Sequence, residues 1–416
     1  MAGNRLSIIA ALVLLCTSLG AQVKPGVEVL RDRGFDCLEG KRVGLLTNPS
    51  GVDRNLKSTI DILWEAEGVR LVALFAPEHG VRGDVYAGDK VETGRDSRTG
   101  LIVHSLYGST RQPTKDMLKG LDAVVYDIQD VGCRSYTFIS SLGLMMRSCA
   151  ELGIEVIVLD RPNPLGGLKV EGSYVEPGFF SFVSQYKIPY IYGLTVGELA
   201  NLINEEGLNR GQQGNLEPLK CKLTVVPMEG WKRSMLFNET GLPWILPSPN
   251  IPYAETAICY PCAGLVGEMY NYLNIGIGYT LPFATFAAEW IDADKLLEKL
   301  ESYKLRGVAF RTIHYKPTSG SSNGKLIHGV QYFMTDYEAA EITLIQFYVM
   351  QAVYELYKKN PFTVSESRIP MFNKVSGSDF VSTTFRKTFR VSDIMGYWRK
   401  DEQDFKDLSK NYYLYN

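Results

Sequence analysis

The 416-residue sequence lacks the short motifs by which most α/β proteins hold nucleotides. No GxGxxG follows its first strand-like run, and no GxxxxGK(S/T) occurs, so neither of the usual phosphate-binding loops is present. A GxSxG nucleophile elbow is also missing, and Ser248 in PSPN is interpreted as a turn serine. These absences argue against nucleotide binding and against a serine hydrolase.

Metal-binding side chains are scarce. Four histidines make a histidine-rich site hard to build, and Cys259 and Cys262 form one CxxC without a second pair, so zinc is not expected. A single divalent ion held by Glu78, His79 and downstream aspartates is the less favoured alternative. Six cysteines follow residue 21, an even number that permits disulfides, although a core of this size does not need them. We predict no metal and no cofactor.

Charge of one sign does not accumulate in the chain. The 44 basic and 46 acidic residues nearly cancel, and no Lys/Arg-rich run stands out. Neither nucleic acid nor anionic lipid is therefore an expected partner, whereas a small molecule or a glycan is compatible with this balance. The sequence gives no indication of the oligomeric state.

The N-terminus has the pattern of a cleaved secretory signal peptide over residues 1–21. Arg5 precedes an apolar run over residues 6–15, and small residues occur at Ser18, Gly20 and Ala21. The run is too short to span a bilayer. Cys16 follows two leucines rather than small residues, so we favour cleavage after Ala21 over lipid anchoring and expect a secreted or periplasmic protein.

Short apolar runs alternate with helical patterns in the first half of the chain. The runs are rich in Val, Ile and Leu, as expected for strands buried on both faces, and they cover 42–48, 70–78, 101–108, 122–130 and 155–163. Helices are predicted over 58–68, 114–121 and 135–153, with Thr114 as an N-cap and Gly153 as a C-terminal glycine. This alternation predicts a parallel sheet with helices on its faces.

Four of the five predicted strands end on polar side chains. These are Asn48; Glu78 and His79; Asp127, Gln129 and Asp130; and Asp160, Arg161 and Asn163. Ligands of open parallel sheets bind outside the carboxyl ends of the strands, so these residues predict one shared site. Each has a structural alternative: an Asx-turn at Asn48, a helix cap at Asp127 or Asp130, and a scaffold pair of Asp160 with Arg161.

Seven motifs occur in an order that resembles the NamZ-type exo-β-N-acetylmuramidases, a family long catalogued as a domain of unknown function. They are TNPSGVD, APEHGVRGD, SLYGSTRQPT, YDIQDVGCRSYTF, LDRPNPLGG, TVGELA and GLPWILPSPNIP, and the resemblance runs from about residue 25 to the C-terminus. It implies a Rossmann-like N-terminal domain, a smaller α+β domain and a cleft between them. It also implies release of N-acetylmuramic acid from the non-reducing ends of peptidoglycan fragments.

The resemblance also supplies candidate site residues. The positions that match the family are Glu78, His79, Arg82, Gly83, Asp127, Gln129, Asp130, Arg134, Tyr136, Asp160, Arg161 and Asn163. We predict catalytic roles for Glu78, Asp127 and Asp130, and substrate contacts for Asn48, His79, Arg82, Gln129, Arg134, Tyr136, Asp160, Arg161, Asn163 and Asn250. Two positions depart from the family pattern. Tyr192 replaces the histidine of a stretch that usually reads HGMT, and Ile277 replaces the arginine of an xGRGT stretch.

Glycoside hydrolysis typically needs one carboxylic acid to protonate the leaving oxygen and a second carboxylate as base or nucleophile. Glu78 is the candidate acid, because apolar surroundings at a strand end raise the pKa of a glutamate. Asp127 and Asp130 compete for the second role. Alternatively, a 2-acetamido sugar attacks its own anomeric carbon while an aspartate orients the amide.

The second half of the chain has a different pattern. Strands are predicted over 307–318 and 327–336, and a long amphipathic helix over 338–359. We therefore predict a Rossmann-like domain over 22–258 and a smaller α+β domain over 259–416 that closes the cleft. Two hypotheses of function remain: a secreted exo-acting glycosidase, or a non-catalytic glycan-binding paralogue with a degraded active site.

The departure at Ile277 leads to a testable expectation. An arginine there could make a bidentate contact with the lactyl carboxylate of N-acetylmuramic acid, whereas isoleucine cannot. Hydrogen bonds to a charged group contribute about 1.5–3 kcal/mol, so preference for muramic over glucosaminic substrates should be weaker by roughly ten- to a hundredfold. Comparison of the two chromogenic glycosides checks this, and Ile277→Arg should improve muramide binding. A strong native preference would contradict it and would indicate Arg134 or Arg161 as the partner of the anion.

Overall fold

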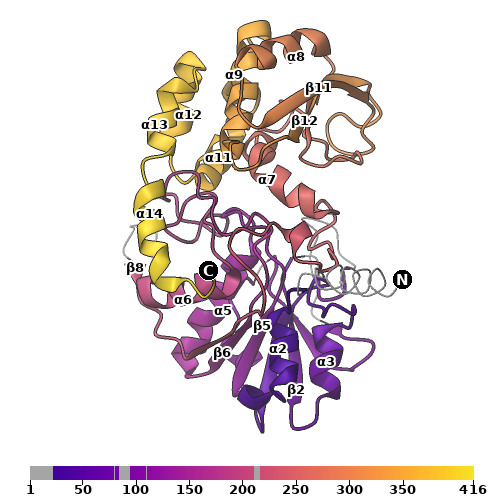
Figure 1. Ribbon diagram of the computed structural model, residues 1–416, viewed down its shortest axis with the longest axis vertical. Helices are drawn as coiled ribbons and strands as arrows, with labels where there is room; N and C mark the ends of the chain where they lie inside the picture. Colours follow the sequence, from indigo (N-terminus) through magenta and orange to yellow (C-terminus); the bar gives the residue numbers. More distant parts are fainter. Residues whose placement is uncertain (1–21, 79, 84–93, 109, 210–215) are drawn as a thin grey trace, which may run out of the picture.

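The computed structural model describes residues 22–416 apart from 79, 84–93, 109 and 210–215. A seven-stranded sheet with helices on both faces forms the lower part of the molecule, and a smaller domain with a three-stranded antiparallel sheet lies above it (Figure 1). The fold is thus α/β with a Rossmann-like sheet domain followed by an α+β domain, as predicted from the alternation of strands and helices.

The large sheet has the order β3-β4-β2-β1-β5-β6-β9. Every neighbouring pair is parallel except β3 with β4. The strands are β1 (Arg42–Thr47), β2 (Arg70–Ala76), β3 (Gly94–Arg95), β4 (Ile102–Ser105), β5 (Ala123–Asp127), β6 (Glu155–Leu159) and β9 (Leu223–Val226). A short separate ribbon pairs β7 (Leu208–Asn209) with β8 (Leu216–Glu217).

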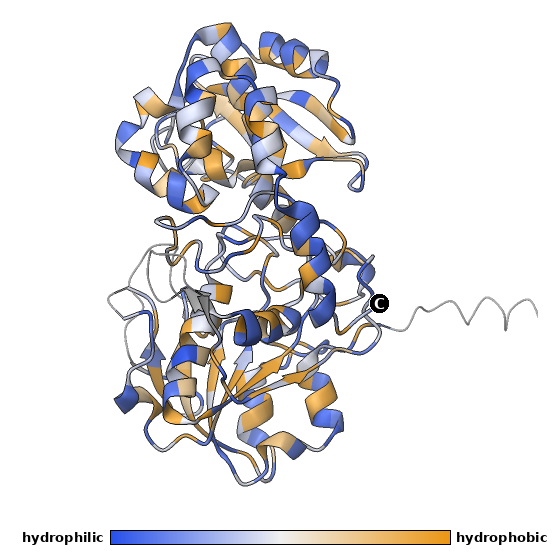
Figure 2. Ribbon diagram, turned by 90° about the vertical axis from the view of Figure 1, so that its left-hand side faces the viewer, coloured by the Kyte–Doolittle hydropathy of each residue, from blue (hydrophilic) through white to orange (hydrophobic). Residues whose placement is uncertain are grey.

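The central strands are buried on both faces, which explains their continuously apolar sequences. In β5, Val124 and Tyr126 pack into the core under one layer of helices, while Ala123 and Val125 pack into the core under the other. Figure 2 shows the strands as mostly apolar ribbons between helices in which polar and apolar residues alternate. Successive side chains of a strand point to opposite faces, so a strand covered on both sides needs apolar residues throughout.

The carboxyl ends of β1, β2, β5 and β6 share one edge of this sheet, because these strands are mutually parallel. Asn48 follows β1, Glu78 lies two residues beyond β2, Asp127 ends β5 and Asp160 follows β6. The prediction that these four positions gather at one sheet edge is confirmed.

Two predicted helix ends of the sheet domain, the N-cap at Thr114 and the C-terminal glycine Gly153, are confirmed. Thr114 caps α4, with its hydroxyl accepting from the Met117 N–H, and Gly153 ends α5 in a left-handed conformation with φ of 68°. The helices are α2 (Gly26–Asp32), α3 (Thr59–Glu65), α4 (Lys115–Leu118), α5 (Phe138–Leu152) and α6 (Val196–Glu206).

The smaller domain contains the predicted strands and the predicted long helix. Its sheet has the antiparallel order β10-β12-β11, from β10 (Thr285–Ala288), β11 (Val308–Tyr315) and β12 (Ile327–Met334). Its helices are α7 (Ala254–Gly267), α8 (Ala293–Ser302), α9 (Ile345–Tyr357), α10 (Pro361–Val364), α11 (Ile369–Ser376), α12 (Phe380–Thr388) and α13 (Ser392–Trp398).

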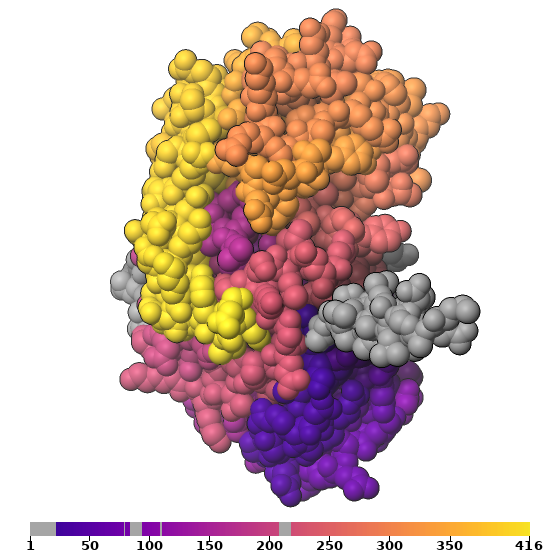
Figure 3. Space-filling view, viewed as in Figure 1, coloured from indigo at the N-terminus to yellow at the C-terminus, as the bar shows by residue number. Residues whose placement is uncertain are grey.

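The end of the chain returns to the sheet domain. The C-terminal helices run along one flank of the molecule from the upper to the lower part (Figure 3). On α14 (Glu402–Ser409), Phe405 packs into the core of the sheet domain, and the Tyr415 hydroxyl donates to Asp160 at 2.6 Å. The last residues therefore belong physically to the N-terminal domain.

The two domains are joined by a continuous core and by one buried cation. Val131, Cys133 and Tyr190 of the sheet domain belong to the same hydrophobic cluster as α7 and α9. Beside them the fully buried Arg134 guanidinium donates to four backbone carbonyls: Ser173 and Ile188 of the sheet domain, and Val375 and Ser376 at the end of α11. Gly377 follows at φ of 89°, where a Cβ would approach the guanidinium to 2.8 Å.

This arrangement predicts a large loss of stability for Arg134→Met. The substitution removes the Arg134 donors from four buried carbonyls, of which Val375 keeps a long contact from the Ser184 hydroxyl at 3.5 Å. Each buried group left unsatisfied costs about 1–3 kcal/mol. We expect the free energy of unfolding, measured by urea denaturation, to fall by more than about 3 kcal/mol, with Arg134→Lys intermediate. The exposed Arg95→Met should change it by less than about 0.5 kcal/mol. A loss below about 1 kcal/mol for Arg134→Met would contradict this role.

Candidate active site

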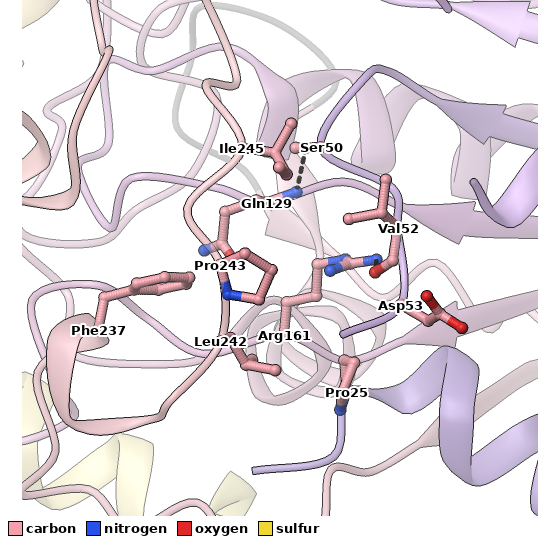
Figure 4. A pocket seen from close by; sticks show the side chains of 10 residues that line it. All are labelled: Pro25, Ser50, Val52, Asp53, Gln129, Arg161, Phe237, Leu242, Pro243 and Ile245. Carbon is pink, nitrogen blue, oxygen red and sulfur yellow. Dashed lines mark hydrogen bonds between the residues drawn. The ribbon is translucent and has the colours of Figure 1, made fainter. Parts of the chain in front are cut away.

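The usual ligand crevice of a Rossmann-like sheet is closed in this protein. The strand order changes direction between β1 and β5, and at such a point the loops leave room for a ligand. Here the segment 237–250 lies across the crevice, with Phe237, Leu242, Pro243 and Ile245 packed over Arg161 (Figure 4). The remaining void has about 10 Å³, which is room for at most one water molecule.

Polar side chains hold this segment in place, and their hydrogen-bonding atoms are occupied by contacts within the protein. The Asn48 amide donates to the Pro247 carbonyl, and its oxygen accepts from the Ser50 N–H. The Ser50 hydroxyl in turn accepts from the Gln129 N–H, the contact drawn in Figure 4. Asn48 and Gln129 are both buried. We therefore assign these two residues to the scaffold of the site rather than to the substrate contacts predicted from the sequence.

Asp127 is held in a buried ion pair. The Arg161 Nε atom donates to Asp127 Oδ1 at 2.5 Å and Nη2 donates to Oδ2 at 2.9 Å, while the Thr59 hydroxyl also donates to Oδ2. Both carboxylate oxygens are thus occupied and no surface of Asp127 is exposed. Both oxygens of Asp127 are taken by this pair, so the structure gives Asp127 a scaffold role in place of the predicted catalytic one. The alternative that paired Arg161 with Asp160 is wrong, because the Arg161 guanidinium pairs with Asp127.

Asp160 also acts within the fold. Its oxygens accept from the Gly197 N–H at the start of α6, from the Thr195 hydroxyl and from the Tyr415 hydroxyl. Burial raises the pKa of Asp160 to about 6, although these hydrogen bonds oppose the shift. A Cβ at Gly197 would lie 2.7 Å from the Asp160 carboxyl carbon, so only glycine allows this close approach.

Three further predicted contacts have partners in the protein. Asn163 forms an Asx-turn by accepting from the Leu165 N–H and donates to the Leu194 carbonyl. Arg82 is paired through two hydrogen bonds with Asp96, at 2.8 and 3.1 Å. Burial alone would raise the pKa of Asp96, but the hydrogen bonds from Arg82 and Thr99 lower this pKa to about 2. Arg134 is the interdomain cation described above, since its donors reach backbone carbonyls.

The remaining predicted residues are placed as follows. Asn250 is half-buried at the end of the covering segment 237–250, and His79 lies outside the described residues. Tyr136 is half-buried, with its ring edge-on to Phe138 and Tyr260. Besides burial, the charges of Asp130 and Glu78 both raise the pKa of the Tyr136 phenol, so its hydroxyl lies within the field of two carboxylates.

Glu78 is the half-buried carboxylate of this group. The Thr137 hydroxyl, next to the start of α5, donates to Glu78 Oε2 at 3.4 Å. Tyr107, in the loop after β4, is also near Glu78: burial raises the pKa of the Tyr107 phenol to about 12, and the Glu78 charge contributes to the shift. Sequence reasoning missed Tyr107 and Thr137, although both belong to quoted motifs and Tyr107 follows a predicted strand.

Asp130 is the second carboxylate, and it is buried. Its Oδ2 atom accepts from the Tyr192 hydroxyl at 2.6 Å and from the Gly132 N–H at 2.8 Å. Its Oδ1 atom has no hydrogen-bond partner among the described residues. Burial raises the pKa of Asp130 to about 6, and the Tyr192 hydroxyl opposes that shift. The departure at Tyr192 thus places a hydrogen-bond donor directly on Asp130.

The second departure lies in the smaller domain. Ile277 is partly buried against the hydrophobic cluster of that domain, between Gly276 and Gly278, which have φ of 89° and 80°. Its backbone carbonyl accepts from the Asn274 amide. The expectation of weaker muramide discrimination therefore remains a prediction.

The described residues contain no group of three His, Cys, Asp or Glu side chains arranged to hold a metal ion. All six cysteines beyond residue 21 are free thiols. None of the helices in the described part of the chain is long and apolar enough to cross a bilayer.

Comparison with known proteins identifies the family to which this chain belongs. The family described as exo-beta-N-acetylmuramidase NamZ matches in two parts, its N-terminal domain over residues 43–255 and its C-terminal domain over residues 258–415. The chain belongs to the NamZ family. The peptidoglycan beta-N-acetylmuramidase NamZ of Bacillus subtilis (strain 168) is 41% identical over 399 residues, which cover 96% of this chain and 93% of that protein.

Two crystal structures of DUF1343 family proteins from Bacteroides fragilis NCTC 9343 have the same fold. One is 51% identical with a TM-score of 0.89 and the other 28% identical with a TM-score of 0.74; each comparison covers 95% of this chain and 99% of that chain. Membership of the NamZ family supports a glycoside hydrolase function acting on peptidoglycan-derived glycan.

The raised pKa of Asp130 leads us to predict how the stability of this NamZ-family protein depends on pH. Because folding favours the protonated carboxyl, the stability that it contributes is present below pH 4 and is lost as the pH rises through about 6. A shift of about two pKa units between the unfolded and the folded protein corresponds to roughly 3 kcal/mol. Asp130→Asn should therefore raise the free energy of unfolding by about 1–3 kcal/mol at pH 7.5 and by little at pH 4.

Urea denaturation at both pH values measures this difference. The exposed Glu67→Gln, outside the helices, is the control and should give the same small change at pH 4 and pH 7.5. A destabilised Asp130→Asn protein at pH 7.5 would show that the buried carboxylate is better satisfied than the contacts of Asp130 indicate.

Proposed function

We propose that this protein is a secreted exo-β-N-acetylmuramidase that releases N-acetylmuramic acid, or a related N-acetylhexosamine, from non-reducing ends of peptidoglycan fragments. The observation that carries the proposal is the pair Glu78 and Asp130, whose charges both act on the Tyr136 phenol. The other predicted aspartates, Asp127 and Asp160, have their oxygens engaged within the fold.

Glu78 is the general acid in this proposal. It is half-buried beyond the end of β2, where the Thr137 hydroxyl donates to its carboxyl group and the Tyr107 phenol is near it. From this position it protonates the glycosidic oxygen as the bond to the anomeric carbon breaks.

Asp130 is the second carboxylate. The hydrogen bonds from Tyr192 and Gly132 hold Oδ2 and leave Oδ1 to act on the substrate. With a pKa of about 6 it is ionised at neutral pH, as a base requires. Whether it activates water or orients a 2-acetamido group is decided by the anomer first released, which NMR identifies.

A recess lies beyond the ends of β1 and β2. It has about 150 Å³ and is lined by Pro49, Arg82, Gly83, Leu246, Pro247, Ser248 and Pro249. Ser248 lies beside the Tyr136 phenol, whose pKa is raised by burial and by the charges of Asp130 and Glu78. The mainly apolar lining of the recess suits the carbon-bound face of a pyranose ring.

Export and domain organisation complete the proposal. The pattern of residues 1–21 supports cleavage after Ala21, so the mature protein would begin at Gln22, which N-terminal sequencing of exported protein tests. In the mature chain, residues 22–258 carry the catalytic groups and residues 259–416 close the cleft.

Glu78→Gln tests the catalytic assignment. The amide keeps the shape of the side chain but cannot supply the proton, so turnover of a muramide with a poor leaving group should fall by about 10²–10⁴-fold. The free energy of unfolding should stay nearly unchanged. The exposed Glu151→Gln is the matched control and should keep native turnover.

The same variant separates the enzyme from a non-catalytic glycan-binding paralogue. If the native protein and Glu78→Gln bind an N-acetylmuramide equally and neither hydrolyses it, the binding paralogue is the correct reading. Native turnover that survives Glu78→Gln would instead remove Glu78 from the mechanism.

A further inference from the structure

The lactyl carboxylate of an N-acetylmuramide needs a cationic partner, and three of the arginines near the strand ends are already engaged. Arg82 is paired with Asp96 and lies 3.7 Å from Asp61, and Arg161 is paired with Asp127. Arg134 is buried and donates to backbone carbonyls. Recruiting any of these would break contacts that hold the scaffold together.

Arg111 differs from those three in its surroundings. It lies in the loop after β4, its side chain is exposed, and no carboxylate of the described residues pairs with it. Its guanidinium carbon lies 4.4 Å from the centre of the Phe182 ring. Contact of the flat guanidinium with an aromatic ring holds it in one orientation and leaves its edge N–H groups for an anion.

Arg111 is also close to the proposed catalytic acid. The Tyr107 phenol feels the charges of both Glu78 and Arg111, with opposite effects on its pKa. All three residues follow strands at the same edge of the sheet, Glu78 after β2 and the other two after β4. A sugar bound with its glycosidic oxygen at Glu78 therefore brings its ring substituents within the neighbourhood of Arg111.

We propose that Arg111 recognises the lactyl carboxylate of the substrate and so gives the protein its preference for muramic over glucosaminic sugars. The inference rests on the proposed function. The contact is a charge-assisted, bidentate pair between the guanidinium edge and both carboxylate oxygens, with Phe182 fixing the orientation of the cation. It replaces the contact that the loss of arginine at Ile277 removes.

This proposal and the expectation drawn from Ile277 predict opposite results for the native protein. If the anion depended on an arginine at position 277, the native chain would discriminate poorly. With Arg111 as the partner, the native chain keeps a marked preference for the charged muramide, and Ile277→Arg adds little to it.

The test varies the charge on both sides of the contact. Two chromogenic substrates are used, an N-acetyl-β-muramide with a free lactyl carboxylate and its lactyl methyl ester, in which a methyl group replaces the negative charge. They are assayed with the native protein, Arg111→Met, Arg111→Lys and Ile277→Arg. Arg70→Met, at the opposite end of β2, is the matched control because it removes an exposed arginine far from the strand ends that carry the site.

Arg111→Met should lower kcat/KM for the free acid by about ten- to a hundredfold and leave that for the ester within about twofold, so the preference for the charged substrate disappears. Arg111→Lys should restore part of it, because an ammonium keeps the charge without the bidentate geometry. Arg70→Met should behave as the native protein does.

Two results would overturn the inference. One is a native protein that hydrolyses the acid and its methyl ester equally well. The other is an acid-to-ester preference that Arg111→Met leaves unchanged. Failure of the proposed function gives a different result, because the native protein would then hydrolyse neither substrate. In that case calorimetry still tests the Arg111 contact, by comparing how tightly the native protein and Arg111→Met bind the acid and its methyl ester.

Discussion

The structure depends on one buried cation that has no acidic partner. Arg134 lies in the loop after β5, and its guanidinium joins two segments of the sheet domain to the end of α11 through four backbone carbonyls. Burial lowers its pKa to about 10, yet it stays charged at neutral pH. The four carbonyl groups take the place of water around the buried guanidinium. Separation of the domains would remove two of these acceptors, Val375 and Ser376, from the cation. This contact fixes the loop that carries Asp130 and Tyr136.

Carboxylates at the same sheet edge fall into two groups that differ in what occupies their oxygens. Asp127 is saturated by Arg161 and Thr59, and Asp160 by the start of α6 and by Tyr415. Asp130 keeps one oxygen without a partner among the described residues, and its elevated pKa shows that the fold tolerates an unfavourable charge there. Groups held at such a cost are typical of sites where charge is needed for chemistry.

The covering segment 237–250 moves the site away from its usual place in a Rossmann-like fold. By filling the crevice between β1 and β5, its prolines and apolar side chains leave no room for a nucleotide and bury the Asp127–Arg161 pair (Figure 4). The ends of β2 and β4 then supply Glu78, Tyr107 and Arg111, and Glu78 accepts from Thr137 at the end of the loop after β5. The chain also closes on itself, since Tyr415 brings the C-terminus to Asp160.

The sequence by itself determined β1, β2, β4, β5, β6, β11 and β12, the shared polar edge, the caps at Thr114 and Gly153, and membership of the family, because these depend on local periodicity and on contiguous motifs. It did not indicate β3, β9 or β10, which are short and contain no long apolar run. The motifs also named Glu78 and Asp130 as carboxylates of the site. Only the tertiary structure decided which polar residues are scaffold. Whether Arg134 meets a substrate or four carbonyls depends on Val375 and Ser376, more than 200 residues away. The contact of Tyr192 with Asp130 likewise joins residues 62 positions apart. Hydrogen-bond satisfaction is a property of packed neighbours, so no local pattern contains it.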